Sequence, residues 1–240
     1  MSEWHTVWHS LSVGPLPWLV LTMAVYLAAL ALYRRSRCHP LLIPVFPAVL
    51  LIVGILLATQ TPYATYQQGT QWLQILVGPA TVALAIPLYT QRTRLLALWR
   101  PISVALAVGC SVALVSAMGI AWVLGASWET LISLAPKSAT IPIALPMAQS
   151  WGGLPSLAAV AVAVTGISGT MLAPWLLRGL RIHDPSVQGF ALGLTAHAIG
   201  TARALQMHPS AGAFAALAMG LNGILTALVM PVCVAFFRHL

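Results

Sequence analysis

Two stretches of the sequence concentrate residues that could bind a small anion, and the first runs from 135 to 146. It holds Lys137, the only lysine of the chain, among two hydroxyl residues and three prolines: Ser138, Thr140, Pro136, Pro142 and Pro146. The prolines cannot share one regular helix, because each lacks an N–H and disfavours helical geometry in the residue before it. We therefore expect extended backbone around 138–141 and a half-helix that starts at Pro142 and directs its positive end at Lys137. In the alternative interpretation, Lys137 belongs to an ordinary loop and snorkels to a membrane surface.

The second stretch places small residues at steps of four and three and ends in a charge: Gly189, Gly193, Ala196, Gly200 and Arg203. On one continuous helix these residues form a single stripe that lets another backbone approach closely. His197 and Thr201 lie beside the stripe. An arginine inside an apolar span usually faces a cavity or a partner, but at a helix end Arg203 would reach the lipid headgroups instead. His197 is either a packing residue or the carrier of a coupled proton.

Two weaker signals concern helix breaks. Gly78 and Pro79 are expected to break the helix predicted over Thr70–Tyr89, and Asn222 with Gly223 is a similar candidate in the last helix. Paired breaks in the two halves of a transporter often mark its binding site, which makes an inverted-repeat transporter fold one option. The alternative for Gly78 and Pro79 is a packing kink without a ligand.

The elements that must position these residues lie in a membrane. Hydrophobic residues make up 60% of the 240, and the mean hydropathy is +0.91. Charged residues make up only 6%, whereas a soluble domain carries about 25%. The net charge of +8 comes from short arginine clusters between apolar runs, which indicates cytoplasmic loops and not a nucleic-acid-binding face. Because the N-terminus carries Glu3 and no basic region, we expect a first span that is retained and not a cleaved signal peptide.

Charge-free stretches predict an all-α polytopic fold with about seven transmembrane helices. The expected helices are Pro17–Tyr33, Pro40–Ala58, Thr70–Tyr89, Pro101–Leu124, Pro155–Leu177, Ser186–Leu205 and Ala211–Phe237. Arginines follow the first, third, fifth and last of them: Arg34, Arg35, Arg37, Arg92, Arg94, Arg100, Arg178, Arg181 and Arg238.

Placing all of these arginines in the cytoplasm sets the topology. The proline-rich stretch Thr130–Ser150 must then leave and re-enter on one side, as a re-entrant hairpin or a broken helix pair. The N-terminus would lie outside and the C-terminus in the cytoplasm. Alternatively, if Thr130–Ser150 and Ser186–Leu205 are both single crossings, Arg178 and Arg181 face outward.

The sequence lacks the patterns of common catalytic and metal sites. No carboxylate pair exists, because the acidic residues are only Glu3, Glu129 and Asp184. HExxH, CxxC and Walker A motifs are absent. The three cysteines are far apart and more typical of packing than of disulfides or metal ligation: Cys38, Cys110 and Cys233. We expect no enzyme, no metal and no cofactor, and the deep positive charges favour an anionic ligand.

These motifs resemble the LrgB/CidB family of bacterial membrane proteins, to which the C-terminal half of the plastid glycolate/glycerate translocator is related. The specific matches are Pro136–Ala144 and Ala196–Arg203. Further matches are Gly78–Tyr89, Asp184 with Pro185, and Gly212–Ala227. The resemblance extends over residues 70–231 of a single expected domain, 1–240. Ala139 and Ile141 depart from the family pattern, where many relatives have Val and Thr.

The resemblance implies two different roles. The plastid members look like carriers of small hydroxycarboxylates. The bacterial members are described as holin/antiholin-like modulators of murein hydrolase activity and autolysis, acting with an LrgA/CidA-type membrane partner, and some are linked to pyruvate uptake. The regulator hypothesis needs an oligomeric packing surface, which Gly189, Gly193, Ala196 and Gly200 would supply.

Our hypothesis from the sequence is a secondary transporter of small monocarboxylates such as glycolate, glycerate, lactate or pyruvate, in the bacterial inner membrane. Lys137 and Arg203 neutralise the carboxylate, hydroxyl groups bind its other oxygens, and His197 carries a coupled proton. The predicted binding residues are Lys137, Ser138, Thr140, Pro142, His197, Gly200, Thr201 and Arg203. A homo-oligomer, with a dimer as the simplest form, is expected from the small-residue stripe.

Overall fold

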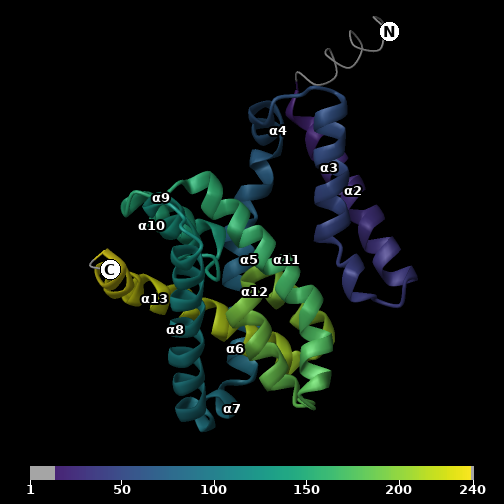
Figure 1. Ribbon diagram of the computed structural model, residues 1–240. Helices are drawn as coiled ribbons and strands as arrows, with labels where there is room; N and C mark the ends of the chain where they lie inside the picture. Colours follow the sequence, from purple (N-terminus) through teal and green to yellow (C-terminus); the bar gives the residue numbers. More distant parts are fainter. Residues whose placement is uncertain (1–13, 239–240) are drawn as a thin grey trace, which may run out of the picture. The chain divides into compact units, whose positions relative to one another are not determined.

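The computed structural model describes residues 14–238, and all regular elements in this range are helices (Figure 1). The predicted all-α class is therefore confirmed. The chain divides into two compact units, Met1–Ala85 and Ile86–Leu240, which are described separately. The single domain over 1–240 stays a prediction, and Glu3 lies outside the described residues.

Unit 1 is built around α2 (Pro15–Arg35), which packs against α3 (Val45–Ala58) and α4 (Tyr63–Ile75). A short turn of 3-10 helix, η1 (Pro40–Leu42), lies between α2 and α3. Gly69 lets α4 approach the Trp18 side chain of α2, where a Cβ would come within 2.6 Å of the ring. The hydroxyls of Thr22 and Tyr66 are 3.0 Å apart and join the same two helices.

The helix predicted over Thr70–Tyr89 is divided into α4, α5 (Val77–Ala83) and α6 (Ala85–Thr90). The first interruption lies at Leu76, and Gly78 and Pro79 lie inside α5. The expected interruption of Thr70–Tyr89 is therefore present, two residues before Gly78. A proline in the first turn of a helix is tolerated, because its missing N–H would have had no partner there.

Unit 2 alternates long helices with interrupted ones. Its long helices are α8 (Trp99–Val123), α11 (Pro155–Gly179) and α13 (Pro209–Arg238). Between α8 and α11 lie the short helices α9 (Trp128–Leu134) and α10 (Ile141–Ser150), and between α11 and α13 lies α12 (Pro185–Met207). The short helix α7 (Arg92–Ala97) precedes α8. The proline-rich stretch is thus a broken helix pair, one of the two forms expected.

Four described helices are long and apolar enough to cross a membrane: Leu16–Arg35, Trp99–Val123, Pro155–Gly179 and Pro209–Arg238. Counting the bent pair Tyr63–Leu73 and Val77–Thr90 as one span gives five. The surface of α8 agrees with this assignment, because Val104, Val108, Val112 and Val115 are all at least half exposed on it. A bilayer solvates such a surface well, so the chain is a multi-pass membrane protein.

Helices α8 and α13 run parallel. Cys110 Sγ of α8 lies 3.5 Å from Thr226 Oγ1 of α13, and further along both helices Gly119 lies beside Phe237. Their buried core includes side chains that also pack on α9: Leu114, Met118, Ala121, Leu131, Ile132, Met230 and Val234. The end of α8, the end of α13 and α9 therefore share one end of unit 2.

Helix α12 reverses its direction at His197, whose φ of 40° and ψ of −126° are not helical. Before this point Gly189 contacts the backbone of Ala211, and Gly193 contacts the backbone of Ala215. The residue numbers rise together along the two helices, so residues 185–196 run parallel to α13. After it, a Cβ on Gly212 would lie 2.5 Å from Leu205. Thr201 Oγ1 lies 3.7 Å from the sulfur of Met219. Residues 198–207 therefore run antiparallel to α13.

This reversal corrects the predicted stripe. Gly189 and Gly193 do let another backbone approach, and that backbone is α13 of the same chain. Ala196 instead faces Gly169 of α11, and Gly200 lies against the carbonyl of Leu192 within α12 itself. One continuous stripe is therefore wrong, because the helix that would carry it turns back on itself.

The reversal also fixes which helix ends lie together. Arg94 Nη2 lies 3.1 Å from Asp184 Oδ2, and Ser210 Oγ donates to Gln91 Oε1 at 3.4 Å. The starts of α8, α12 and α13 therefore share one end of unit 2. We call it the basic end, because it carries Arg92, Arg94, Arg100, Arg178 and Arg181.

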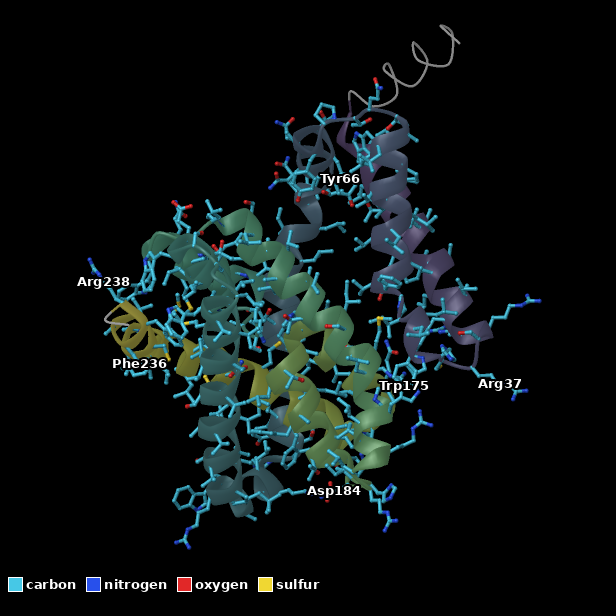
Figure 2. The ribbon with its side chains drawn as sticks, in the orientation of Figure 1. Arg37, Tyr66, Trp175, Asp184, Phe236 and Arg238 are labelled. Atoms are coloured by element: carbon cyan, nitrogen blue, oxygen red, sulfur yellow. The ribbon has the colours of Figure 1, made fainter. Side chains whose placement is uncertain are left out.

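Arg238 ends α13 far from the basic end, as Figure 2 shows for Asp184 and Arg238. Arg238 therefore lies at the opposite end of unit 2 from Arg178 and Arg181, because residues 186–205 return to the end from which they started, and the membrane side of the C-terminus stays a prediction. Helix α11 runs opposite to α8 and α13. It begins beside α9, where Leu154 N donates to Ser133 Oγ at 2.7 Å, and it ends at the basic end.

Asp184 defines where α12 begins. Its carboxylate accepts a hydrogen bond of 2.7 Å from the Ser186 N–H and caps the helix. That N–H and the nearby guanidinium of Arg94 hold the pKa of Asp184 below its usual range. The acidic side chain at the basic end is thus used to fix a helix start.

Replacing Gly193 by alanine tests the close approach of α12 and α13. The added Cβ meets the Ala215 backbone, which cannot move as a side-chain tip can. We expect Gly193→Ala to cost about 2 kcal/mol and to lower the melting temperature in detergent by about 5 °C. Gly220→Ala is the matched control, since nothing lies within 4 Å of that position. Equal melting temperatures for the two variants would contradict the packing.

Candidate functional site

The side-chain amide of Asn222 connects the two interrupted segments of unit 2. Its Nδ2 donates to the Ser138 carbonyl at 3.0 Å and to the Leu194 carbonyl at 3.2 Å. Ser138 lies in the connection between α9 and α10, and Leu194 lies in the last turn before α12 reverses. We call this meeting point the junction and define it by Ser138, Val162, Leu194, His197 and Asn222.

The junction supplies hydrogen-bond donors to backbone carbonyls that a broken helix leaves without partners. The last carbonyls of a helix have no partner within it, and an apolar surrounding offers no water to replace one. Asn222 is buried, with 1% of its surface exposed, and supplies donors to a carbonyl at each of the two breaks. Its Oδ1 is buried without a hydrogen-bond partner among the described residues.

The extended backbone expected around 138–141 is confirmed only at Thr140, because Ser138 lies in a turn and Ile141 already belongs to α10. Thr140 is extended, with φ −74° and ψ 153°, and α10 begins at Ile141, one residue before the predicted start. Pro142 occupies the first turn of the helix. The positive end of α10 therefore faces the connection that carries Lys137 and Ser138.

The second break is built around His197, whose side chain is 3% exposed. Its Nε2 lies 3.0 Å from the Val162 carbonyl of α11. Because a carbonyl only accepts hydrogen bonds, Nε2 carries a hydrogen and donates. Gly166 of α11 makes room for the ring, since a Cβ there would lie 2.6 Å from His197 Cε1.

Small residues hold the helices around the junction close together. Ala139, Ala144 and Val162 form a buried apolar cluster that joins the first break to α11. Gly223, next to Asn222 on α13, lies against Ile143 of α10, where a Cβ would come within 2.6 Å of the Ile143 side chain. The position of Asn222 relative to both breaks is therefore fixed by packing as well as by its hydrogen bonds.

The structure brings only some of the predicted residues together. Ser138 and His197 belong to the junction, and Thr201 is buried beside α13. Lys137 and Thr140 are partly exposed on the α9–α10 connection, and Pro142 is exposed. Gly200 supports the reversal of α12. Asn222 and Gly223 do not break α13, which is helical throughout, so that assignment is wrong.

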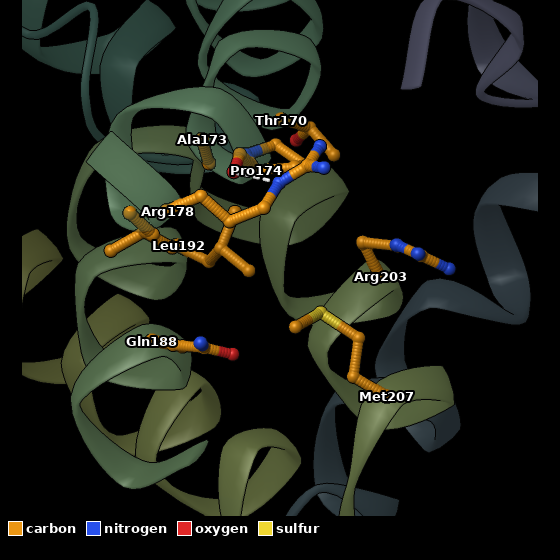
Figure 3. A pocket seen from close by; sticks show the side chains of 9 residues that line it. Thr170, Ala173, Pro174, Arg178, Gln188, Leu192, Arg203 and Met207 are labelled. Carbon is orange, nitrogen blue, oxygen red and sulfur yellow. Dashed lines mark hydrogen bonds between the residues drawn. The ribbon is translucent and has the colours of Figure 1, made fainter. Parts of the chain in front are cut away.

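Arg203 lies elsewhere, in a cavity of about 150 Å³ between α11 and α12 (Figure 3). Arg178, Gln188 and Met207 also line this cavity, and no residue of 136–142 does. Lys137 and Arg203 thus do not line one cavity. A continuous helix would carry Arg203 to the opposite end of the span, whereas the reversal at His197 returns it toward the basic end.

Sequence reasoning missed the roles of several residues. Asn222 is the only asparagine of the chain, so its rarity within an apolar helix is a signal that the sequence does contain. Val162 contributes only its backbone carbonyl, which no sequence pattern reveals. Arg178 and Gln188 reach the cavity because α11 and α12 pack together, which also has no sequence signature.

Removing the Asn222 amide tests its structural role. Asn222→Leu leaves the Ser138 and Leu194 carbonyls without this donor, and we expect the melting temperature in detergent to fall by about 8 °C, equivalent to about 3 kcal/mol. Asn222→Asp keeps the size of the side chain but removes the donor. Its melting temperature should be no higher than that of Asn222→Leu. The control is Thr226→Val on the next turn, whose hydroxyl contacts only the weakly bonding Cys110 thiol. A melting temperature for Asn222→Leu equal to that of Thr226→Val would show that the bridge contributes little.

Comparison with known proteins agrees with the sequence motifs. The LrgB-like family matches residues 22–236. The chain is 38% identical to the Bacillus subtilis (strain 168) protein YxaC over 220 residues, which cover 92% of this chain and 95% of the relative. It is 36% identical to YwbG of the same organism over 219 residues, 91% of this chain and 96% of the relative. Both relatives are described as uncharacterized, and no solved structure matches the chain significantly. The protein therefore belongs to the LrgB-like family.

Proposed function

We propose that this protein is a secondary transporter of small monocarboxylates, with its binding site at the junction. The observation that carries this proposal is that two interrupted helical segments, which start from opposite ends of unit 2, meet at Asn222. Secondary transporters form their sites from such discontinuous helices near the middle of the membrane. A purely structural bundle has no need for two breaks at one buried point, since each break costs helix hydrogen bonds.

An inverted repeat accounts for this arrangement. Residues 99–150 comprise a long helix, α8, followed by the broken pair α9 and α10. Residues 155–207 comprise a long helix, α11, followed by the reversed helix α12. Because α8 and α11 run in opposite directions, the two segments have inverted topology, and α13 passes between their breaks.

The arginines give this arrangement its orientation. The positive-inside rule places the basic end of unit 2, and the loop with Arg34 and Arg35 after α2, in the cytoplasm. The N-terminus then lies outside the bacterial inner membrane, as the sequence predicts. The C-terminus also lies outside, because α13 starts at the basic end. With α3 added to the five candidate spans, this arrangement would have six crossings and two re-entrant hairpins, since residues 186–205 return to the cytoplasmic side.

The chemistry of the junction suits a small carboxylate. Two half-helices, α10 and residues 198–207, begin next to the breaks, and their positive ends attract an anion. Lys137 adds a formal charge on the α9–α10 connection, where Ser138 and Thr140 carry hydroxyls, and Thr201 carries a further hydroxyl beside α13. The unpartnered Oδ1 of Asn222 would accept a hydrogen bond from a hydroxyl of the substrate.

The acidic residues lie where they do not oppose an anion. Asp184 pairs with Arg94 at the basic end, and Glu129 lies exposed in the first turn of α9. Among the described residues, the junction therefore has only positive and neutral groups. His197 can carry a coupled proton on Nδ1 while Nε2 keeps its bond to Val162. These groups support the proposal of a carrier for a small anion.

The alternative role, an antiholin-like modulator that acts with an LrgA/CidA-type partner, loses the surface on which it depended. Gly189 and Gly193 are buried against α13, and Ala196 and Gly200 are buried within unit 2. These residues are therefore not free to pack against another protein. A homodimer would need a different surface.

Uptake into liposomes tests the proposal. The purified chain, reconstituted without a partner, should take up labelled glycolate or pyruvate saturably, and a competing hydroxycarboxylate should block this uptake. Lys137→Gln should reduce uptake at least about tenfold, because the cationic partner of the carboxylate is lost. Arg181→Gln, a control that removes a cation from the α11–α12 loop, should leave uptake unchanged.

Two results would contradict this account. Uptake by Lys137→Gln at the level of the unaltered chain would remove Lys137 from the site. Leakage of unrelated dyes that needs the LrgA/CidA-type partner, with no saturable uptake, would instead support the regulatory role.

A further inference from the structure

We propose that the cavity between α11 and α12 is a binding site for a phosphate group, supplied by an anionic phospholipid or by free phosphate. This site is separate from the junction and does not depend on the proposed transport function. The cavity measures about 150 Å³, and its polar lining is Thr170, Arg178, Gln188 and Arg203. The guanidinium groups come from two helices that run to the same end of unit 2.

The polar lining has the chemistry that phosphate requires. A guanidinium presents several N–H groups in one plane and binds phosphate oxygens in pairs, which a lysine cannot do. Arg178 Nε donates to the Pro174 carbonyl at 2.9 Å, which holds its guanidinium beside the cavity. Figure 3 shows Arg178 and Gln188 extending from one wall of the cavity, whereas Arg203 lies on the opposite wall and its guanidinium is directed away from both. Gln188 is itself held by a 2.8 Å hydrogen bond from Nε2 to the Ile182 carbonyl.

The apolar lining favours a lipid as the source of the phosphate. Ala173, Leu177, Leu192 and Met207 complete the wall of the cavity. A free, hydrated phosphate gains nothing from these side chains, whereas the glycerol and the first acyl carbons of a lipid do. The level of the cavity along the helices also fits a lipid headgroup, because Arg178 lies in the last turn of α11 and Met207 ends α12. Lipid phosphates lie at the level of such helix ends, and basic pockets between membrane helices on the cytoplasmic side bind them.

The reversal of α12 is what creates this site. In a straight helix, Gln188 and Arg203 would lie at opposite ends of the span, about 22 Å apart at 1.5 Å per residue. The reversal brings both to one cavity, with Arg178 on the neighbouring helix. A lipid bound there would hold the second half of α12 against α11, which gives it a means of stabilising the hairpin.

Thermal melting of the purified full chain in detergent tests the proposal. The probes are phosphatidylglycerol, phosphatidylcholine, sodium phosphate and glycolate, each compared at equal ionic strength. Phosphatidylglycerol should raise the melting temperature by about 5 °C, as expected for a ligand well above its dissociation constant, and phosphatidylcholine should have little effect. The double variant Arg178→Gln with Arg203→Gln should lose most of this rise. Arg181→Gln is the matched control, since it removes a nearby cation that does not line the cavity, and it should keep the rise.

A second readout does not depend on stability. Native mass spectrometry should detect about one retained phosphatidylglycerol on the unaltered chain and on Arg181→Gln, and none on the double variant. An equal rise with sodium phosphate, lost in the double variant, would support the same chemistry with a soluble source. Equal phosphatidylglycerol effects in all three proteins would overturn the proposal. A rise in melting temperature with glycolate alone would also overturn it, because the cavity would then bind the transported substrate.

Discussion

A single buried amide, that of Asn222, holds the interrupted helices of unit 2 in place. A broken helix in an apolar surrounding leaves carbonyl groups that must find donors within the protein. Asn222 gives one N–H to the α9–α10 connection and one to the end of the first half of α12. The long helix α13 can carry this amide between the breaks only because Gly189, Gly193 and Gly223 allow α12 and α10 to lie so close. The reversal at His197, the position of the basic end and the cavity with Arg203 all follow from this arrangement.

The sequence predicts the first break because the cause of that break is local. It does not predict the second, because contacts between distant residues cause that one. Three prolines remove backbone donors between 136 and 146, so the interruption of that helix is encoded locally. Nothing local interrupts 186–205, where glycine and alanine spacing suits a straight helix equally well. His197 is held at a positive φ by its contact with Val162 and by the space that Gly166 leaves. These contacts link residues far apart in sequence, so periodicity and spacing cannot reveal them.

The charges show how one missed reversal changes a whole topology. Counting arginines predicts that Arg178, Arg181 and Arg238 lie on one side, but the structure separates Arg238 from the basic end, which Asp184 marks in Figure 2. The same error put Lys137 and Arg203 on one carboxylate. The family assignment does not depend on topology, because it rests on a sequence match over residues 22–236. Of the residues predicted at the first break, Ser138 belongs to the junction, whereas the binding roles of Lys137, Thr140 and Pro142 stay predictions.

The central claim is that α12 enters and leaves the membrane on one side, so that its break meets the other at Asn222. Single cysteines introduced into a cysteine-free chain, labelled with a membrane-impermeant maleimide in intact and opened cells, test it directly. His183→Cys precedes α12 and His208→Cys follows it, and Ala126→Cys and Trp151→Cys flank α9 and α10 in the same way. The account predicts that positions 183 and 208 react from one side, and 126 and 151 from the other. Labelling of 183 and 208 from opposite sides would contradict it, because α12 would then cross the membrane.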